Sequence, residues 1–485
     1  MLFSSPTFLF IFLPAVLGLY ALVRREGRNA LLLAASLLFY CWGEGGYVFV
    51  LLFCTAFNYG MGRWLGRTSG PRASKAVLAL AVAGNLALLV AFKYSNFLVD
   101  NLNPWLSAAG LRPVFLPPVH LPLGISFFTF QALSYVMDVY RREAPPQKSL
   151  LTFALYKTLF PQLIAGPIVR YKDVADELTR RSVRREDLAA GVKRFVVGLG
   201  KKMLLANTLA VAADGVFSTS AAGLTPALAW LGIVCYTLQI YFDFSGYSDM
   251  AIGLGRLFGF HFLENFRHPY AATSLTDFWR RWHISLSTWF RDYLYIPLGG
   301  NRGGRWRTCL NLTAVFALCG LWHGASWNFL VWGLFHGAFL VAERLGLGRV
   351  LERVWRPIRH AYLLLAVMAG WVFFRAATLH DAQLFLRTLL GLHVGGSGGS
   401  VGFYLHTELA LVLPLAVLCA TPVWPFLERI GQGLVPTLTG RDGRVAPLLQ
   451  AAWAFADVAG CTAVLLASTT LLAVGTYNPF IYFRF

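Results

Sequence analysis

The sequence has little charge, and acidic residues are especially scarce. Only 13% of its 485 residues are charged, with 42 Lys and Arg against 23 Asp and Glu, whereas soluble domains average about 25% charged residues. Its seven cysteines form no CxxC pair and no zinc-type spacing, so nothing indicates a metal site. We expect these cysteines to be small buried apolar residues and expect no bound metal.

Other familiar signals are also missing. The first seven residues carry no basic group, and Arg24 and Arg25 follow the first apolar run, so a cleavable signal peptide is not indicated. By the positive-inside rule, the first helix should run from outside to cytoplasm. The glycine-rich turn at 297–304 lacks the GxxxxGK pattern of a phosphate-binding loop. No internal repeat is visible, although many transporters have one.

What the chain does have is apolar runs along its whole length. It is 57% hydrophobic with a mean hydropathy of +0.57. At about 20 residues per span, the runs predict an all-α polytopic membrane protein with about ten to twelve helices. We expect one integral membrane domain over residues 1–485. The basic residues lie between the spans, with candidate cytoplasmic loops at 63–75, 141–148 and 170–194, which favours contact with lipid head groups over binding of nucleic acid.

The most informative segment is 320–328, with the sequence GLWHGASWN. It places His323 inside an apolar run from about 312 to 341, followed by His336 in the same run. Ionisable groups at membrane depth are costly, which makes a functional role the default hypothesis. A neutral imidazole is also well suited to proton transfer near pH 7. For His336 we favour a structural role, paired with Glu343.

The segment 274–298 has a different pattern. Ser274 and Asp277 have the spacing of a helix-capping box. Aromatic residues and His283 then recur at helical spacing, while Arg281 falls off this stripe. The pattern predicts one amphipathic helix lying in the membrane interface.

Polar residues also gather at 236–249, where Gln239 and Asp243 are one helical turn apart. A carboxylate in such apolar surroundings must pair with a cation or become neutral. The pair can therefore serve as a clamp between helices, or it can position a substrate or a histidine. The sequence at 161–167, PQLIAGP, indicates a broken helix, which membranes tolerate where protein covers the backbone.

Two of these segments together carry a resemblance to a known family. The sequence FWRRWHISLSTWFRDY at 278–293, followed by LWHG at 321–324, resembles the membrane-bound O-acyltransferase (MBOAT) family, and within it the membrane components of bacterial alginate O-acetylation. The likeness extends over most of the chain and is weakest over about 345–470. It implies a helical bundle around a tunnel, with His323 as the essential family histidine and His283 as the second important one.

The resemblance also implies substrates and partners. The donor would be a cytoplasmic acetyl group, with acetyl-CoA as a substrate and no permanently bound cofactor. The partner would be a periplasmic acetyltransferase resembling SGNH hydrolases, acting on an exported polysaccharide such as alginate. The chain would then be a multi-pass protein of the bacterial inner membrane.

The chemistry of acyl transfer assigns further roles. Activating a hydroxyl needs a base, which we assign to His323. The oxyanion that forms needs donors, for which Trp322 and Asn328 are candidates. We add Gln239, Asp243 and Arg281 as candidate substrate-binding residues, and we expect His283 to orient the acceptor or polarise the thioester.

The aromatic tail at 478–485, NPFIYFRF, carries the boldest hypothesis. It resembles the end of the small companion peptide of D-alanyl transfer systems. Tyr482 would accept the acetyl group and pass it to the periplasmic partner. The alternative is that the tail is an aromatic anchor at the membrane interface.

Several other functions remain open at this point. Within the family, the acceptor could be cellulose or peptidoglycan, or the reaction could be D-alanyl transfer from a carrier protein. Outside it, a transporter of lipid-linked sugar or a non-catalytic subunit of a polysaccharide export machine would share the apolar spans. Neither of these needs the tryptophan–histidine motifs.

Overall fold

The structure is a computed structural model that describes residues 1–393, 395, 400–423, 426 and 446–475. Within these residues the chain is helical and has no strand. Seven helical stretches are long and apolar enough to cross a membrane, so the predicted all-α polytopic fold is confirmed. The expected number of about ten to twelve spans stays a prediction, because four of these stretches each contain more than one helix.

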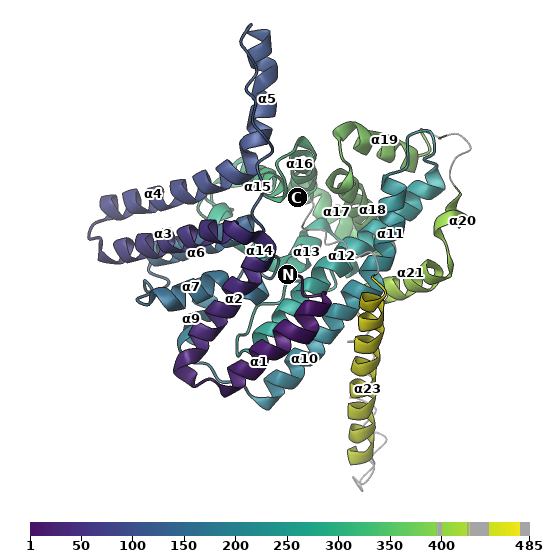
Figure 1. Ribbon diagram of the computed structural model, residues 1–485. Helices are drawn as coiled ribbons and strands as arrows, with labels where there is room; N and C mark the ends of the chain where they lie inside the picture. Colours follow the sequence, from purple (N-terminus) through teal and green to yellow (C-terminus); the bar gives the residue numbers. More distant parts are fainter. Residues whose placement is uncertain (394, 396–399, 424–425, 427–445, 476–485) are drawn as a thin grey trace.

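The amino-terminal part is a series of apolar helices with one sharp turn. A π-helical segment, η4 (Val90–Tyr94), separates the fourth helix from the fifth, and α5 projects from the body of the molecule (Figure 1). Such π-helical turns often mark functional sites. The helices are α1 (Leu13–Leu22), α2 (Arg28–Glu44), α3 (Val48–Arg67), α4 (Pro71–Leu89) and α5 (Ser95–Ala108).

The central part surrounds one long buried helix, α12 (Pro226–Leu257). A Cβ added at Gly198 would lie 2.6 Å from the carbonyl oxygen of Gly246, so α10 and α12 cross with their backbones nearly touching, as membrane helices do through small residues. The other helices here are α6 (Ile125–Arg141), α7 (Leu150–Thr158), α8 (Phe160–Leu163), α9 (Tyr171–Thr179), α10 (Arg185–Gly200) and α11 (Asn207–Phe217). The predicted break at 161–167 is present, since α8 ends at Leu163.

The segment 274–298 differs from its prediction. Ser274 caps α13 (Leu275–Arg281) as expected, because its side chain accepts the N–H of Asp277 at 3.1 Å. The prediction of a single amphipathic helix is wrong, however. His283 has a φ of +43° and ends the helical path before α14 (Ile284–Phe290) begins. The aromatic side chains of the segment are buried in the protein core, so packing between helices overrides the periodic pattern. Its place in the membrane interface stays a prediction.

The long apolar run that follows is a helical hairpin. Helix α15 (Gly304–His323) ends at the histidine, and α16 (Trp327–Ala342) returns beside it. A Cβ at Gly333 would lie 2.2 Å from the carbonyl oxygen of Phe316, so the two helices are in very close contact. The remaining helices are α17 (Gly348–Arg353), α18 (Arg356–Arg375), α19 (Leu379–Leu389), α20 (Val401–Tyr404), α21 (Thr407–Ala420) and α23 (Ala446–Ala473), which projects from the body (Figure 1).

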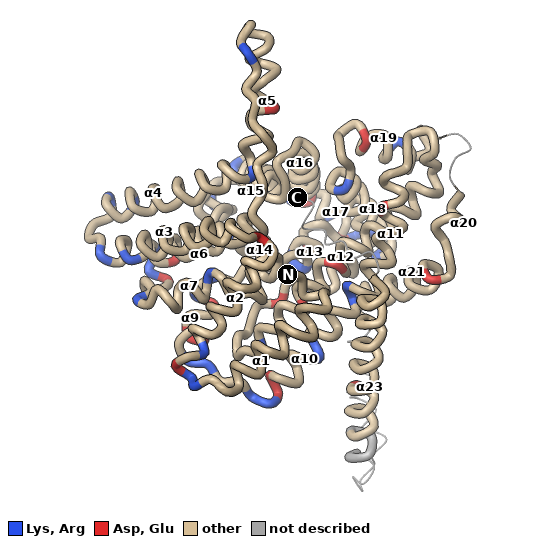
Figure 2. The backbone as a smooth tube through the Cα atoms, viewed as in Figure 1, with Lys and Arg blue, Asp and Glu red and all other residues tan. Residues whose placement is uncertain are grey.

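The basic loops lie on one face of the molecule. Figure 2 shows Lys and Arg gathered at the α3–α4 turn and around α9 and α10. The loops touch one another, since a Cβ at Gly66 would meet Pro146 at 2.5 Å and Lys172 pairs with Glu143 at 2.5 Å. We name this side the basic face. By the positive-inside rule we expect this face to be cytoplasmic, and this orientation stays a prediction.

Candidate active site

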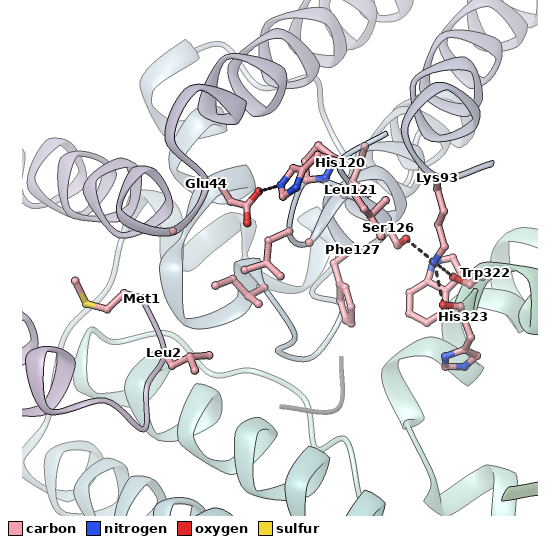
Figure 3. A pocket seen from close by; sticks show the side chains of 16 residues that line it. Met1, Leu2, Glu44, Lys93, His120, Leu121, Ser126, Phe127, Trp322 and His323 are labelled. Atoms are coloured by element: carbon pink, nitrogen blue, oxygen red, sulfur yellow. Dashed lines mark hydrogen bonds and ion pairs between the residues drawn. The ribbon is translucent and has the colours of Figure 1, made fainter. Parts of the chain in front are cut away.

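A cavity of about 390 Å³ connects the histidine motif to one face of the protein. Glu44 and His120 line one end of it, and Lys93, Trp322 and His323 line the other (Figure 3). Glu44 and His120 contact each other through a carboxylate oxygen and Nε2, 3.0 Å apart. The cavity therefore begins at a pair formed by a carboxyl group and a histidine, and it ends at the predicted catalytic residue.

The Glu44 end of the cavity lies away from the basic face. Helix α2 starts beside the basic loops, because Asn29 donates to the carbonyl oxygen of Leu178 at 2.9 Å. It ends at Glu44 after 17 residues, which is a length of about 25 Å. Helix α6 agrees with this direction, since it begins at the cavity with Ile125 and ends at Arg141 on the basic face.

His323 is the last residue of α15 and is only 6% exposed. Its ring packs edge-on against the rings of Trp322 and Trp332, with centroids 4.9 and 5.0 Å away, and against Phe374 at 5.2 Å. These aromatic walls fix the orientation of the imidazole and exclude most of the solvent. Among the residues that the structure describes, His323 Nδ1 has no hydrogen-bond partner. The ring is therefore held by packing, and this nitrogen is uncommitted.

Lys93 holds the end of the helix that carries His323. Its Nζ donates to the main-chain carbonyl oxygens of Trp322 at 2.5 Å and His323 at 3.1 Å, and to Ser126 Oγ at 3.3 Å. The neighbouring Tyr94 hydroxyl donates to the carbonyl oxygen of Leu321 at 2.7 Å. Carbonyl groups at a helix carboxyl end lack partners within the helix and carry partial negative charge. The π-helical turn η4 thus supplies a cationic cap to α15.

Sequence reasoning missed this role, although a signal was present. Lys93 is a cation inside the apolar run at 76–98, and intramembrane cations are functional candidates by default. The sequence could not show that Lys93 contacts the histidine motif, which lies more than two hundred residues further along the chain. The contact depends on the tertiary fold.

His283 lies behind the cavity wall. Its ring centroid is 6.1 Å from that of Trp322 and 6.5 Å from that of Phe127, and both of those rings line the cavity. The side chain is fully buried. Its Nδ1 lies 3.2 Å from Oδ1 of Asn265. The ring of Trp322 therefore lies next to the rings of both predicted histidines.

Trp322 is the predicted substrate-binding residue that the structure places best. It lines the cavity between His283 and His323. Its indole Nε1–H is buried and has no partner in the described part of the chain. An indole nitrogen can only donate a hydrogen bond. The wall beside His323 therefore offers a donor toward a carbonyl oxygen.

The other predicted substrate-binding residues lie elsewhere. Asp243 pairs with Lys202 of η5 (Lys201–Ala206) at 2.6 Å, with Gln239 buried one turn earlier on α12. Asn328 donates to the carbonyl oxygen of Ala376 at 2.7 Å, and Arg281 pairs with Asp277 at 2.9 Å. None of the four is among the described residues that line the cavity. Asp243 and Asn328 join helices, while the Arg281 pair lies within one helix.

His336 is buried, and its predicted pairing with Glu343 is wrong. Glu343 instead accepts the main-chain N–H groups of Leu275 and Thr276, at 2.7 and 2.9 Å. These N–H groups begin α13 and lack partners within that helix, so the carboxylate turns to them. The His336 ring packs against Trp279 at 5.3 Å and Trp332 at 5.1 Å.

Two other expectations concern the tail and bound metals. Tyr482 and the tail at 478–485 lie outside the described residues, so the relay hypothesis stays a prediction. In the described part of the chain, no group of three or more His, Cys, Asp or Glu side chains has an arrangement that could hold a metal ion.

Comparisons with known proteins point in the same direction as this geometry. The model of the MBOAT, membrane-bound O-acyltransferase, family matches residues 119–374. The chain is 42% identical to the probable alginate O-acetylase AlgI of Pseudomonas putida, over all of both chains. It is 36% identical to the peptidoglycan O-acetyltransferase of Helicobacter pylori, over 81% of this chain and 80% of that protein. It is 29% identical to the teichoic acid D-alanyltransferase of Bacillus subtilis, over 55% and 73% respectively.

Proposed function

The chain belongs to the membrane-bound O-acyltransferase family, and on that premise we propose that it passes an acetyl group from cytoplasmic acetyl-CoA to an exported polysaccharide such as alginate. It is a membrane O-acyltransferase. The observation that supports the proposal most strongly is the position of His323, at the inner end of a cavity whose other end lies away from the basic face. We place the protein in the bacterial inner membrane.

In the proposed reaction, His323 is the general base. The acceptor hydroxyl gives its proton to the imidazole while its oxygen attacks the thioester carbonyl carbon. The C–S bond then breaks, and the leaving coenzyme A thiolate takes the proton back from the imidazolium. A positioned base contributes about 10²–10⁴-fold to such a step. The free ring nitrogen of His323 supports this role.

The developing negative charge on the carbonyl oxygen needs a donor. The Trp322 indole N–H stands next to His323 in the cavity wall and has no partner among the described residues. A donor fixed in place before the reaction is worth more than one that water would supply. We assign this role to Trp322. Asn328 is a weaker candidate, because its amide nitrogen already binds the carbonyl oxygen of Ala376.

Donor and acceptor would reach the site from opposite faces. Coenzyme A carries phosphate groups that arginine binds well, which suits the basic face and its loops at 141–148 and 170–194. The acceptor side would use the cavity end at Glu44 and His120. We propose that the acceptor there is presented by a periplasmic acetyltransferase resembling SGNH hydrolases.

The donor is the part of the proposal that a direct experiment tests best. Purified protein in proteoliposomes should release coenzyme A from acetyl-CoA and bind it more weakly as salt rises, because screening weakens contacts to phosphate. An acylated carrier protein is the alternative donor, as the relation to a D-alanyltransferase suggests. Turnover of the carrier protein with none of acetyl-CoA would overturn the acetyl-CoA assignment.

A further inference from the structure

The amide of Asn265 is oriented by the main chain. Its side chain is fully buried. Its Oδ1 accepts the main-chain N–H of Ser285 at 3.2 Å and the Ser285 hydroxyl at 2.9 Å. Its Nδ2 donates to Ser248 Oγ at 3.0 Å. Because a main-chain N–H can only donate, the atom that faces Ser285 must be the amide oxygen.

The oriented amide determines where the proton of His283 lies. His283 Nδ1 is 3.2 Å from the same Oδ1. An amide oxygen has no hydrogen to give, so Nδ1 must carry the ring hydrogen. The Ser285 hydroxyl also lies 3.5 Å from His283 Nδ1, but its contact with Asn265 Oδ1 is much shorter, at 2.9 Å, and its oxygen accepts the N–H of Ile168 at 3.0 Å. The neutral ring therefore has its lone pair on Nε2.

The backbone around this contact is fixed as well. The N–H of Ile284 donates to the carbonyl oxygen of Asn265, and the N–H of Arg267 donates to that of Arg281, both at 3.0 Å. These bonds hold His283 in its left-handed conformation, with φ +43° and ψ +54°. Strained positions of this kind cluster at functional sites. The Nε2 atom is buried and has no partner in the described part of the chain.

We propose that Asn265 is a positioning residue that holds His283 as its Nδ1–H tautomer, so that Nε2 accepts a hydrogen bond from a second hydroxyl of the acceptor, while the reacting hydroxyl is left to His323. This inference rests on the proposed function, and it also requires the cavity wall at Trp322 to open so that the acceptor reaches the buried His283. It separates two roles for His283. Polarising the thioester carbonyl would need an N–H at Nε2, whereas orienting the acceptor through its second hydroxyl needs a lone pair there. The donor toward the carbonyl oxygen is then left to Trp322.

The tautomer can be measured without any substrate. Solid-state ¹⁵N spectra of protein in bilayers, labelled at the histidine rings, separate protonated from unprotonated ring nitrogens, and a His283→Gln variant assigns the signals. We expect a protonated Nδ1 and an unprotonated Nε2 in the parent. We expect this pattern to be lost in Asn265→Leu. A protonated Nε2 in the parent, or an unchanged pattern in Asn265→Leu, would overturn the inference.

Kinetics test whether the tautomer matters. Loss of a partner that orients a histidine typically costs about 10–100-fold in activity at metal sites, and we expect a loss of that size in kcat for Asn265→Leu, with little change in the KM for acetyl-CoA. Asn265→Asp keeps an acceptor oxygen in place and should recover most of the rate with the parent tautomer. Equal rates for the Asn265→Leu and Asn265→Asp variants would contradict the proposed positioning role of Asn265.

A control variant separates this effect from damage to the fold. Asn311 is another buried amide, which binds the carbonyl oxygens of Leu298 and Gly300, and Asn311→Leu should leave the His283 spectrum unchanged. If Asn265→Leu does not fold, the spectrum of the parent and the spectrum and rate of Asn265→Asp still test whether Asn265 sets the tautomer of His283. If the parent shows the expected tautomer but does not turn over acetyl-CoA, the donor assignment fails and the role of Asn265 in setting the tautomer stands.

Discussion

The Lys93 ammonium nitrogen lies 3.1 Å from the main-chain carbonyl oxygen of His323. The two residues come from helices far apart in the sequence, and their contact ties the π-helical turn η4 to the end of α15. The cap leaves the imidazole of His323 free of any bond to Lys93. The structure thus separates Lys93, which holds the end of α15, from the His323 imidazole, which we propose as the general base.

Replacing Lys93 by Met should lower activity and stability together. The methionine keeps most of the side-chain volume but leaves the carbonyl groups of Trp322 and His323 without their donor, which costs about 1–3 kcal/mol for a buried acceptor. We expect acetyl transfer to fall at least about tenfold, since small displacements of a catalytic group are costly. The measurements are the rate of acetyl transfer and the thermal unfolding midpoint in detergent.

The matched control for this change is Lys75→Met on α4, the helix that precedes η4. Lys75 is exposed on α4, so its loss should change neither the rate of acetyl transfer nor the thermal unfolding midpoint appreciably. If Lys93→Met behaves like Lys75→Met, the cap does not position His323.

The close contact between α15 and α16 gives a second prediction. Gly333→Ala places a Cβ 2.2 Å from the carbonyl oxygen of Phe316, so the hairpin must open. Overpacking of this kind costs about 1–3 kcal/mol, and the shift should also reduce activity, because α15 ends at His323. Gly18→Ala on α1 is the control, since nothing lies within 4 Å of its added Cβ. An unchanged unfolding midpoint for Gly333→Ala would show that the hairpin adjusts freely.

Much of the fold could be predicted from the sequence because its signals are local. Apolar runs predict membrane helices, and Ser274 caps α13 at the predicted residue. The broken helix near Pro161 also follows from local backbone chemistry. The break at His283 could not be predicted in this way. The aromatic spacing around it fits one helix, and the left-handed turn depends on hydrogen bonds from the segment that contains Asn265.

The candidate site was predicted less completely than the fold. His323 and Trp322 were found because their motif is dense and unusual, and both line the cavity. Asp243 was chosen from a polar cluster on one helix face and Arg281 from the motif at 278–293, and each is engaged by an oppositely charged neighbour. Lys93 and Asn265 act through the fold and have no local motif. Sequence spacing cannot reveal contacts across such long separations.

His261 lies at the basic face, and we expect its contacts there to depend on pH. Its Nδ1 lies 2.7 Å from Glu177 and its Nε2 lies 3.2 Å from Asp187. The hydrogen bond to Glu177, followed by that to Asp187, raises the pKa of His261 above 6.5. The stabilisation is therefore fully present below about pH 6.5 and is lost as pH rises through the raised pKa. His261 is half exposed, so solvent screening limits the effect to about 1 kcal/mol or less.

The measurement for His261 is the thermal unfolding midpoint of the parent and of His261→Gln from pH 5.5 to about 9. The difference between the two proteins should be largest at the acidic end and should shrink as pH rises. A difference that grows with pH would contradict the assigned direction of the pKa shift.

The tail hypothesis predicts the effect of a single hydroxyl. If Tyr482 carries the acetyl group, its phenol proton goes to His323 while its oxygen attacks the thioester carbon, and the leaving coenzyme A thiolate then takes that proton. In the second transfer the acceptor oxygen attacks the aryl ester, the C–O bond to Tyr482 breaks, and the leaving phenolate takes up the proton that the acceptor hydroxyl loses. Tyr482→Phe should abolish polymer acetylation while leaving membrane levels normal. Persistent acetylation in that variant would show that transfer to the partner is direct and that the tail is an anchor.

The role of His323 as general base is the central claim, and acetyl transfer by His323→Ala tests it most directly. The variant should be compared with the parent in cells that make the polysaccharide, at matched membrane levels, and as purified protein with acetyl-CoA. We predict a loss of about 10²–10⁴-fold with the protein still folded and inserted. Acetylation close to the parent's level from a well-expressed His323→Ala protein would contradict the account.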